Sequence, residues 1–160
     1  MTHVIVRRNA LIIDGRQSTG ALAIARGTGR LLVRLGFSVV AELPLASGRR
    51  ADLVALGGGG EVWIVEIKSS IDDFRADAKW PDYRMHCDRL FFAVAEDFPL
   101  ELLPDDVGIV VADSHGAALL REAPEHRMPA PTRKALTLRF AATAALRLHA
   151  VVDPMVGVPD

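Results

Sequence analysis

The sequence is almost without cysteine and shows neither a long apolar run nor a zinc-binding pattern. The single cysteine, Cys87, excludes an internal disulfide framework and is typical of a reducing compartment. No uninterrupted apolar stretch is long enough to cross a bilayer, and the five histidines lack zinc-ligand spacing. The N-terminal residues place an arginine pair between two short apolar runs, unlike a signal peptide. We therefore expect a soluble cytoplasmic protein without membrane contact.

The chain has 160 residues, half of them hydrophobic, which suits one domain over residues 1–160 with its own core and a short flexible tail from about residue 150. Its charge is unevenly distributed. Residues 1–50 hold eight arginines against two acidic residues, and the remainder is acidic. This asymmetry points weakly to a polyanionic partner, and its alternative reading is that solvated arginines keep a helix soluble.

The stretch "GRQSTGALAIARGTGRLLVRLGF" predicts a helix from about Ser18 to Leu35. Ser18 or Thr19 can cap its start, and Gly36 stands where a C′ glycine is expected. Helical spacing assigns a buried face to Ile24, Thr28, Leu31 and Leu35. The same spacing places Arg26, Arg30 and Arg34 on the opposite, solvent-facing side.

The rest of the chain mixes strands with helices. Strands are expected at 37–45, 49–56, 61–68, 90–95 and 107–113, and segment 116–123 is ambiguous. Residues 71–89 have helical composition with Pro81 inside, which predicts a kink or two short helices. Residues 124–133 contain several prolines and are expected to form a loop. A last helix is expected from Thr132 to about His149. This order predicts an α/β layer fold, a central mixed sheet flanked by helices.

A glycine turn joins "RRADLVAL" to "EVWIVEIK". If residues 58–60 form a three-residue loop, Asp52 faces Glu66 across the hairpin, and Lys68 shares their face. Two carboxylates so placed repel each other, and a divalent cation such as Mg²⁺ would remove the conflict. Lys68 could then neutralise charge on a phosphate. The alternative is an exposed strand end with an ordinary ion pair.

Asp52 followed by Glu66-Ile67-Lys68 after a hairpin resembles the PD-(D/E)xK signature of the restriction-endonuclease-like nuclease superfamily. More specifically, "SGRRADLVAL", "WIVEIKSSIDDFRADAKWPDYRMHCDRLFFAV" and "REAPEHRMPAPTRKALTLRFA" resemble the MmcB-type DNA repair family, from about Asp14 to Leu148. The resemblance implies a restriction-endonuclease-like three-layer fold. It implies a metal-dependent DNA nuclease acting in repair, with DNA as partner and other repair proteins as candidate partners.

By this resemblance, Asp52 and Glu66 would bind Mg²⁺ or Mn²⁺, the Ile67 carbonyl could add a ligand, and Lys68 would be catalytic. Lys79 and Tyr83 match the spacing of a Q-x-x-x-Y element, with Lys in place of Gln, and would contact the DNA strand from one helix face. Arg26, Arg30 and Arg34 are further candidates for nucleic-acid binding. Ala51 replaces the signature proline, and the first helix lacks an acidic third ligand, for which Glu42 is a weak substitute.

Two readings of function stay open at this point. The first is a nuclease that requires Mg²⁺ or Mn²⁺, and the second is a DNA-binding or partner-binding repair module with the same fold and no turnover. His86-Cys87-Asp88 does not make a cysteine-protease triad, because adjacent residues do not converge as nucleophile and base must. Cys87 is expected to pack in the core.

Overall fold

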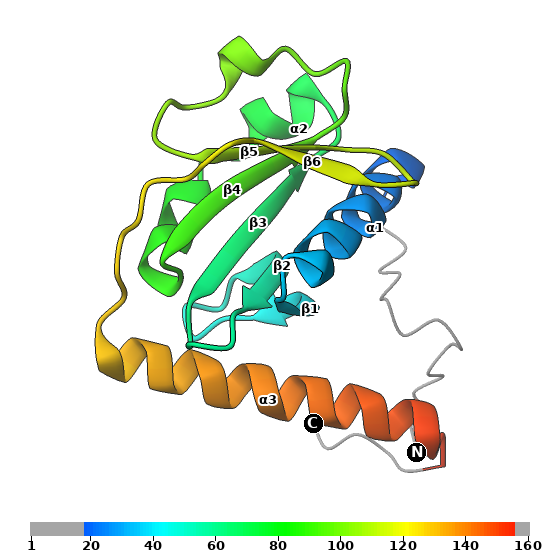
Figure 1. Ribbon diagram of the computed structural model, residues 1–160, viewed down its shortest axis with the longest axis vertical. Coiled ribbons are helices and arrows are strands. Elements are labelled where there is room, and N and C mark those ends of the chain that lie inside the picture. Colours follow the sequence, from blue (N-terminus) through cyan, green and yellow to red (C-terminus); the bar gives the residue numbers. More distant parts are fainter. Residues whose placement is uncertain (1–17, 156–160) are drawn as a thin grey trace.

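The computed structural model describes residues 18–155, which form a six-stranded mixed sheet with helices on both faces (Figure 1). The strands lie side by side in chain order: β1 (Ser38–Pro44), β2 (Arg50–Leu56), β3 (Val62–Lys68), β4 (Arg89–Val94), β5 (Gly108–Ala112) and β6 (Ala117–Arg121). Antiparallel pairing joins β1 to β2, β2 to β3 and β5 to β6, whereas β3, β4 and β5 run parallel. The predicted mixed sheet is confirmed, and the ambiguous segment 116–123 contains a strand.

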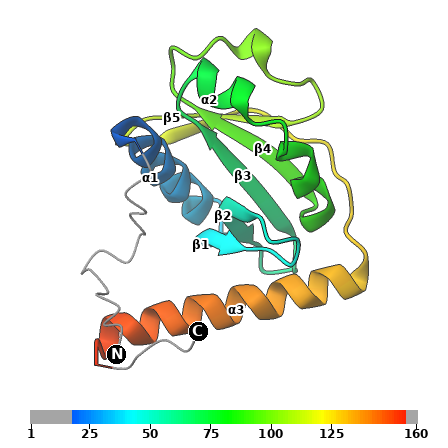
Figure 2. The same ribbon diagram turned by 180° about the vertical axis from the view of Figure 1, so that it is seen from behind.

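Helices form the outer layers. Within residues 18–155 these are α1 (Thr19–Arg34), α2 (Ile71–Ala76), the 3-10 helices η1 (Trp80–His86) and η2 (Leu100–Leu102), and α3 (Ala130–Val152). α1 packs on one face of the sheet, while η1, α2 and α3 lie on the other side (Figure 2). The expectation of two short helices around Pro81 is confirmed. Pro81 falls in the first turn of η1, where its missing N–H costs nothing.

The start and end of α1 follow the predicted capping pattern. Ser18 Oγ accepts a hydrogen bond from the Ala21 N–H at 3.1 Å. Gly36 follows the helix with a φ of +91°, a conformation that glycine adopts without steric penalty.

The buried face of α1 was predicted only in part. Ile24 and Thr28 are buried as expected, but Leu35 is 49% exposed. α1 ends at Arg34, so Leu35 lies past the last helical turn and cannot continue the buried stripe. Leu32, which is 1% exposed, packs against the sheet instead, and Leu31 is half-buried.

Two apolar clusters hold the layers together. One lies between the sheet and α3, η1 and α2, and includes Val54, Ile64, Phe92, Leu136 and Phe140. The other lies between the sheet and α1, and includes Ile24, Leu32, Leu53, Val65 and Phe91. Alternate residues of β2 and β3 therefore enter opposite clusters, as expected of a sheet covered on both faces.

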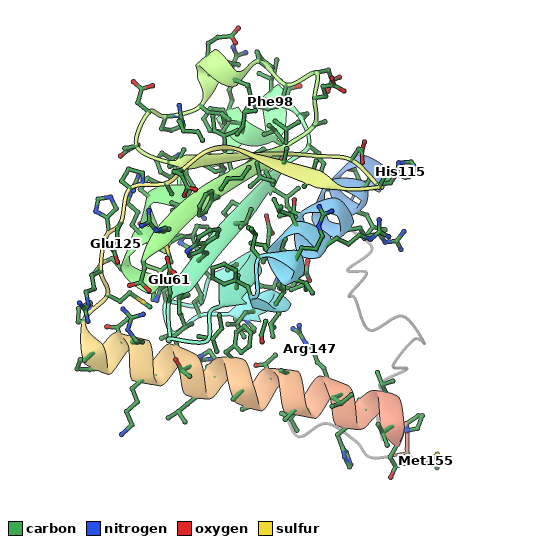
Figure 3. The ribbon with its side chains drawn as sticks, in the orientation of Figure 1. Glu61, Phe98, His115, Glu125, Arg147 and Met155 are labelled. Atoms are coloured by element: carbon green, nitrogen blue, oxygen red, sulfur yellow. The ribbon has the colours of Figure 1, made fainter. Side chains whose placement is uncertain are left out.

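An arginine near each end of α3 forms hydrogen bonds with residues in or next to the sheet. Arg133 bonds to both carboxylate oxygens of Asp88 at 2.6 Å, and Asp88 is only 2% exposed. Burial would raise the pKa of Asp88, but the bonds from Arg133 and from backbone N–H groups lower it to about 2. Near the other end, Arg147 points toward β1 and donates to the carbonyls of Ala41 and Glu42 (Figure 3).

α3 is longer than predicted, and most of its exposed residues are apolar, although Lys134, Arg139 and His149 are exposed as well. In the described part of the chain it is the one helix whose length and composition would let it cross a membrane, although core helices of soluble proteins pass the same test. Leu138, Leu148 and Val152 are more than half exposed. The expectation that no uninterrupted apolar run is long enough to cross a bilayer still holds for α3, because Arg133, Lys134, Arg139 and Arg147 interrupt it.

The close approach of α1 to the β5–β6 turn requires a glycine. A Cβ atom on Gly27 would lie 2.1 Å from the Asp113 carbonyl oxygen, whereas a Cβ atom on Gly29 would meet nothing within 4 Å. We predict that Gly27→Ala lowers the thermal midpoint, because the backbone of the turn must shift. Gly29→Ala should raise it, since alanine favours a helix interior by about 1 kcal/mol over glycine. Calorimetry of the two variants tests this, and equal effects would contradict the packing described.

Candidate active site

The β2–β3 hairpin brings Asp52 and Glu66 together. Leu53 pairs with Val65 and Leu56 with Val62, and the Gly57 N–H donates to the Glu61 carbonyl at 2.8 Å to close the turn. Continued by one residue, this register sets Asp52 opposite Glu66. The predicted three-residue loop at 58–60 and the predicted facing of the two acids are confirmed.

Each carboxylate accepts a backbone N–H from the opposite strand. Asp52 Oδ2 accepts from the Ile67 N–H at 2.8 Å, and Glu66 Oε1 accepts from the Asp52 N–H at 3.1 Å. Leu53–Val65 is the last residue pair of β2 and β3 at this end of the hairpin. Beyond it, these two side-chain hydrogen bonds replace the backbone hydrogen bonds between the strands. They hold two acidic side chains beside one another, and each carboxylate has a second oxygen that can accept or coordinate.

Burial makes both acids harder to ionise. Burial raises the pKa of Asp52, against the hydrogen bond from Ile67 and the charge of Lys68. Burial, followed by the negative charge of Asp52, raises the pKa of Glu66 well above its usual range. A proton shared between the two carboxyls, or a cation bound between them, relieves this repulsion.

Lys68 is paired with an acid that sequence reasoning did not identify. Its Nζ lies 2.6 Å from Asp77 Oδ2, and the lysine is only 5% exposed. Burial would lower the pKa of Lys68, but the hydrogen bond and charge of Asp77 raise it overall. The same bond outweighs burial at Asp77 and lowers the pKa of its carboxyl. Lys68 is therefore an ammonium ion at neutral pH.

These groups line one pocket, which we call the carboxylate pocket. Its volume is about 380 Å³, and its walls include Asp52, Glu66, Ile67, Lys68, Asp73 and Tyr83. Asp73 was not predicted as a site residue; it lies in the first turn of α2, and its Oδ2 accepts the Ser69 N–H at 3.2 Å. Strand alternation could not have found Asp73 or Asp77, because both follow the strand end.

Regular strand alternation fails beside the two acids. Val40 and Leu43 pack in the same apolar cluster although they are three residues apart, whereas residues on one face of a regular strand are an even number apart. The backbone irregularity lies at Glu42, which has a φ of +49°. Glu42 lies at the β1 position opposite Asp52, is 5% exposed, and has its Oε2 3.4 Å from Arg50 Nη1. A side chain rarely tolerates this backbone conformation outside functional or tightly constrained segments.

The predicted helix-face pair Lys79 and Tyr83 is wrong in its geometry. Lys79 precedes η1 and is exposed, because α2 ends at Ala76 and the chain bends before Pro81. Tyr83 does reach the carboxylate pocket, where its hydroxyl donates to the Arg50 carbonyl at 2.9 Å. Burial and the nearby carboxylates raise the pKa of Tyr83, so this hydroxyl stays protonated.

The other residues considered from the sequence are the three arginines of α1, which are exposed, and Cys87, which is buried. Arg26, Arg30 and Arg34 are exposed on α1, as expected, and Arg30 also donates to the Ser114 and His115 carbonyls. Cys87 is buried, and burial raises the pKa of its thiol to about 12, so it is a packing residue without thiolate character.

The donor set fits a hard divalent cation. No group of three or more His, Cys, Asp or Glu side chains gathers as a metal site within residues 18–155, so Glu42 is not a third ligand in this structure. Asp52 and Glu66 supply the one or two carboxylates that Mg²⁺ commonly uses beside water and phosphate. Burial and then the negative charge of Asp52 raise the pKa of Glu66, and such an ion would relieve that repulsion.

Two facing acids and a buried ammonium thus lie together at the end of a covered mixed sheet. The chain belongs to the MmcB-like DNA repair protein family, whose model matches residues 8–155. A solved structure from Silicibacter pomeroyi, the SPO1766 protein of unknown function, is 43% identical. That similarity covers 90% of this chain and 99% of the other, with a TM-score of 0.86. No curated protein matches the chain.

The repulsion between the acids predicts a pH-dependent effect of Glu66→Gln. The folded protein keeps a proton on Glu66 above its ordinary pKa of 4.5, where the unfolded chain has lost it, so stability falls as pH rises through this range. Glutamine keeps the oxygen that accepts the Asp52 N–H and removes the charge. Without metal, we expect Glu66→Gln to raise the thermal midpoint at pH 8 by roughly 2–4 °C, equivalent to about 1 kcal/mol.

Calorimetry in a chelator at pH 5 and pH 8 checks this expectation. The gain should shrink at pH 5, where Glu66 holds its proton in the wild-type protein. Asp105→Asn, at an exposed acid outside the pocket, is the matched control and should change little at either pH. A midpoint for Glu66→Gln that is lower than wild type at pH 8 would contradict the assigned repulsion.

Proposed function

We propose that the protein is a DNA nuclease that requires Mg²⁺ or Mn²⁺ and hydrolyses phosphodiester bonds in DNA repair. Its fold would then be of the restriction-endonuclease-like kind. The observation that carries the proposal is the facing of Asp52 and Glu66 in one pocket with the Lys68 ammonium. Membership in a DNA repair family supports DNA as the partner. A cytoplasmic location stays a prediction.

Asp52 and Glu66, with the Ile67 carbonyl, would hold the cation. A divalent cation at such a site supplies Lewis-acid polarisation of a phosphate oxygen and lowers the pKa of water. Lys68 would face the phosphate as a fixed positive charge and stabilise the negative charge that develops on it during hydrolysis. Asp77 would position Lys68, because their 2.6 Å ion pair holds the ammonium in one place.

One observation favours the second candidate, a DNA-binding module without turnover. The Lys68 ammonium is already neutralised by Asp77, and one oxygen of each acid is used by a backbone N–H. A site arranged in this way could hold DNA through a cation and never complete hydrolysis. The two candidates differ in one measurable result, which is cleavage.

Cleavage of a panel of flapped, nicked and single-stranded DNAs separates the candidates. We expect Mg²⁺- or Mn²⁺-dependent products from the wild-type protein. Glu66→Gln and Lys68→Met should each lower the rate by roughly 10³-fold, since each removes charge stabilisation from the reacting phosphate. Asp105→Asn is the control for loss of an exposed acid and should cleave as wild type does.

The cleavage result distinguishes the nuclease from the binding module. Products that persist at equal rates in Glu66→Gln and Lys68→Met would show a contaminating enzyme and remove the proposal. No products on any DNA, together with salt-sensitive DNA binding, would favour the binding module.

A further inference from the structure

A second cavity lies against the first. We call it the arginine pocket; its volume is about 650 Å³, and it lies between α1 and the β1–β2 end of the sheet. Leu22, Ala25, Gly29 and Val33 form its wall on one stripe of α1, and Val39, Ala41 and Leu53 form its floor. Arg26, Arg30 and Arg34 line it as well, and Asp52 lines both this cavity and the carboxylate pocket. The two cavities are therefore neighbours that share one catalytic candidate.

Neither packing nor backbone conformation requires a glycine at position 29. A glycine inside a helix costs about 1 kcal/mol relative to alanine. For Gly27 that cost is explained by the close approach of the β5–β6 turn, but a Cβ atom on Gly29 would meet nothing within 4 Å. Gly29 also lacks a positive φ. Its missing side chain leaves the wall of the arginine pocket open at this position.

The walls of the pocket combine apolar surface with charged side chains. The α1 stripe and the strand floor are apolar, the three arginines supply positive charge, and the carboxylates of Glu42 and Asp52 line the end of the cavity nearest the carboxylate pocket. Arg30 is held by the Ser114 and His115 carbonyls at 2.6 and 3.2 Å, so one guanidinium is fixed in place. His115 lies at the β5–β6 turn and also lines the pocket (Figure 3). Apolar surface and guanidinium planes are the groups on which unpaired bases stack, while arginines also contact phosphates.

We propose that the arginine pocket binds an unpaired base of the DNA strand whose neighbouring phosphate occupies the carboxylate pocket. This inference rests on the proposed function, because it takes DNA as the substrate. A volume of about 650 Å³ lies in the range of ligand pockets and accommodates one nucleoside. A base inside a duplex cannot reach such a cavity unless it is extruded from the stack. The pocket therefore selects DNA with single-stranded ends, flaps or unpaired nucleotides.

Filling the cavity tests the proposal without cleavage. The probe is an oligonucleotide with 2-aminopurine in a short single-stranded overhang, titrated in a chelator and followed by its fluorescence. Gly29→Leu places a side chain in the open space, and we expect it to weaken binding roughly tenfold, as loss of one stacked base does. Gly20→Leu, an exposed position on the same helix with only Ser18 Oγ within 4 Å of its Cβ, is the matched control and should bind as wild type does.

The controls separate this proposal from the proposed function. Thermal midpoints of both variants at or above wild type show that the fold is intact. Equal affinity of Gly29→Leu and Gly20→Leu would overturn the base pocket, as would equal wild-type affinity for the overhang and for a fully paired duplex. Because the titration contains no metal, a protein that binds the overhang but cleaves nothing would retain the pocket and lose the nuclease.

Discussion

The repulsion between Asp52 and Glu66 is the constraint on which the site depends. The hairpin register leaves the two acids facing each other, and backbone hydrogen bonds across the strands hold them there. Burial penalises the charged form of each acid and raises the pKa of both carboxyls, and the negative charge of Asp52 raises the pKa of Glu66 further. A fold that only needed stability would replace such a pair with apolar residues. The proposed cation would account for the presence of this pair in a covered sheet.

Neighbouring residues hold the groups around Asp52 and Glu66 in place. Asp77 keeps Lys68 charged and in place beside the acids, and Tyr83 ties η1 to the β2 backbone at Arg50. On the other side of Asp52, the irregular backbone at Glu42 interrupts the alternation of β1. Asp52 thus stands between two cavities, one polar with acids and a lysine, the other apolar with arginines. The proposed nuclease and the proposed base pocket both follow from this shared position.

Local sequence signals predicted most of the fold and the centre of the site. The glycine turn set the β2–β3 register, and strand alternation then placed Asp52 opposite Glu66. Chain bends and helix ends were less predictable. Lys79 was expected on a helix, but α2 stops at Ala76, and Leu35 was expected in the core although α1 ends before it. Asp77 was missed for the same reason, since its contact with Lys68 depends on how the chain turns between two short helices.

Crystals of the protein soaked in Mn²⁺ would show, through the anomalous scattering of the metal, whether Asp52 and Glu66 bind a cation. We expect one anomalous peak within coordination distance of carboxylate oxygens from both Asp52 and Glu66, absent from Glu66→Gln crystals treated in the same way. A well-ordered pair of side chains with no peak between them at millimolar Mn²⁺, or a peak at another site alone, would contradict this expectation.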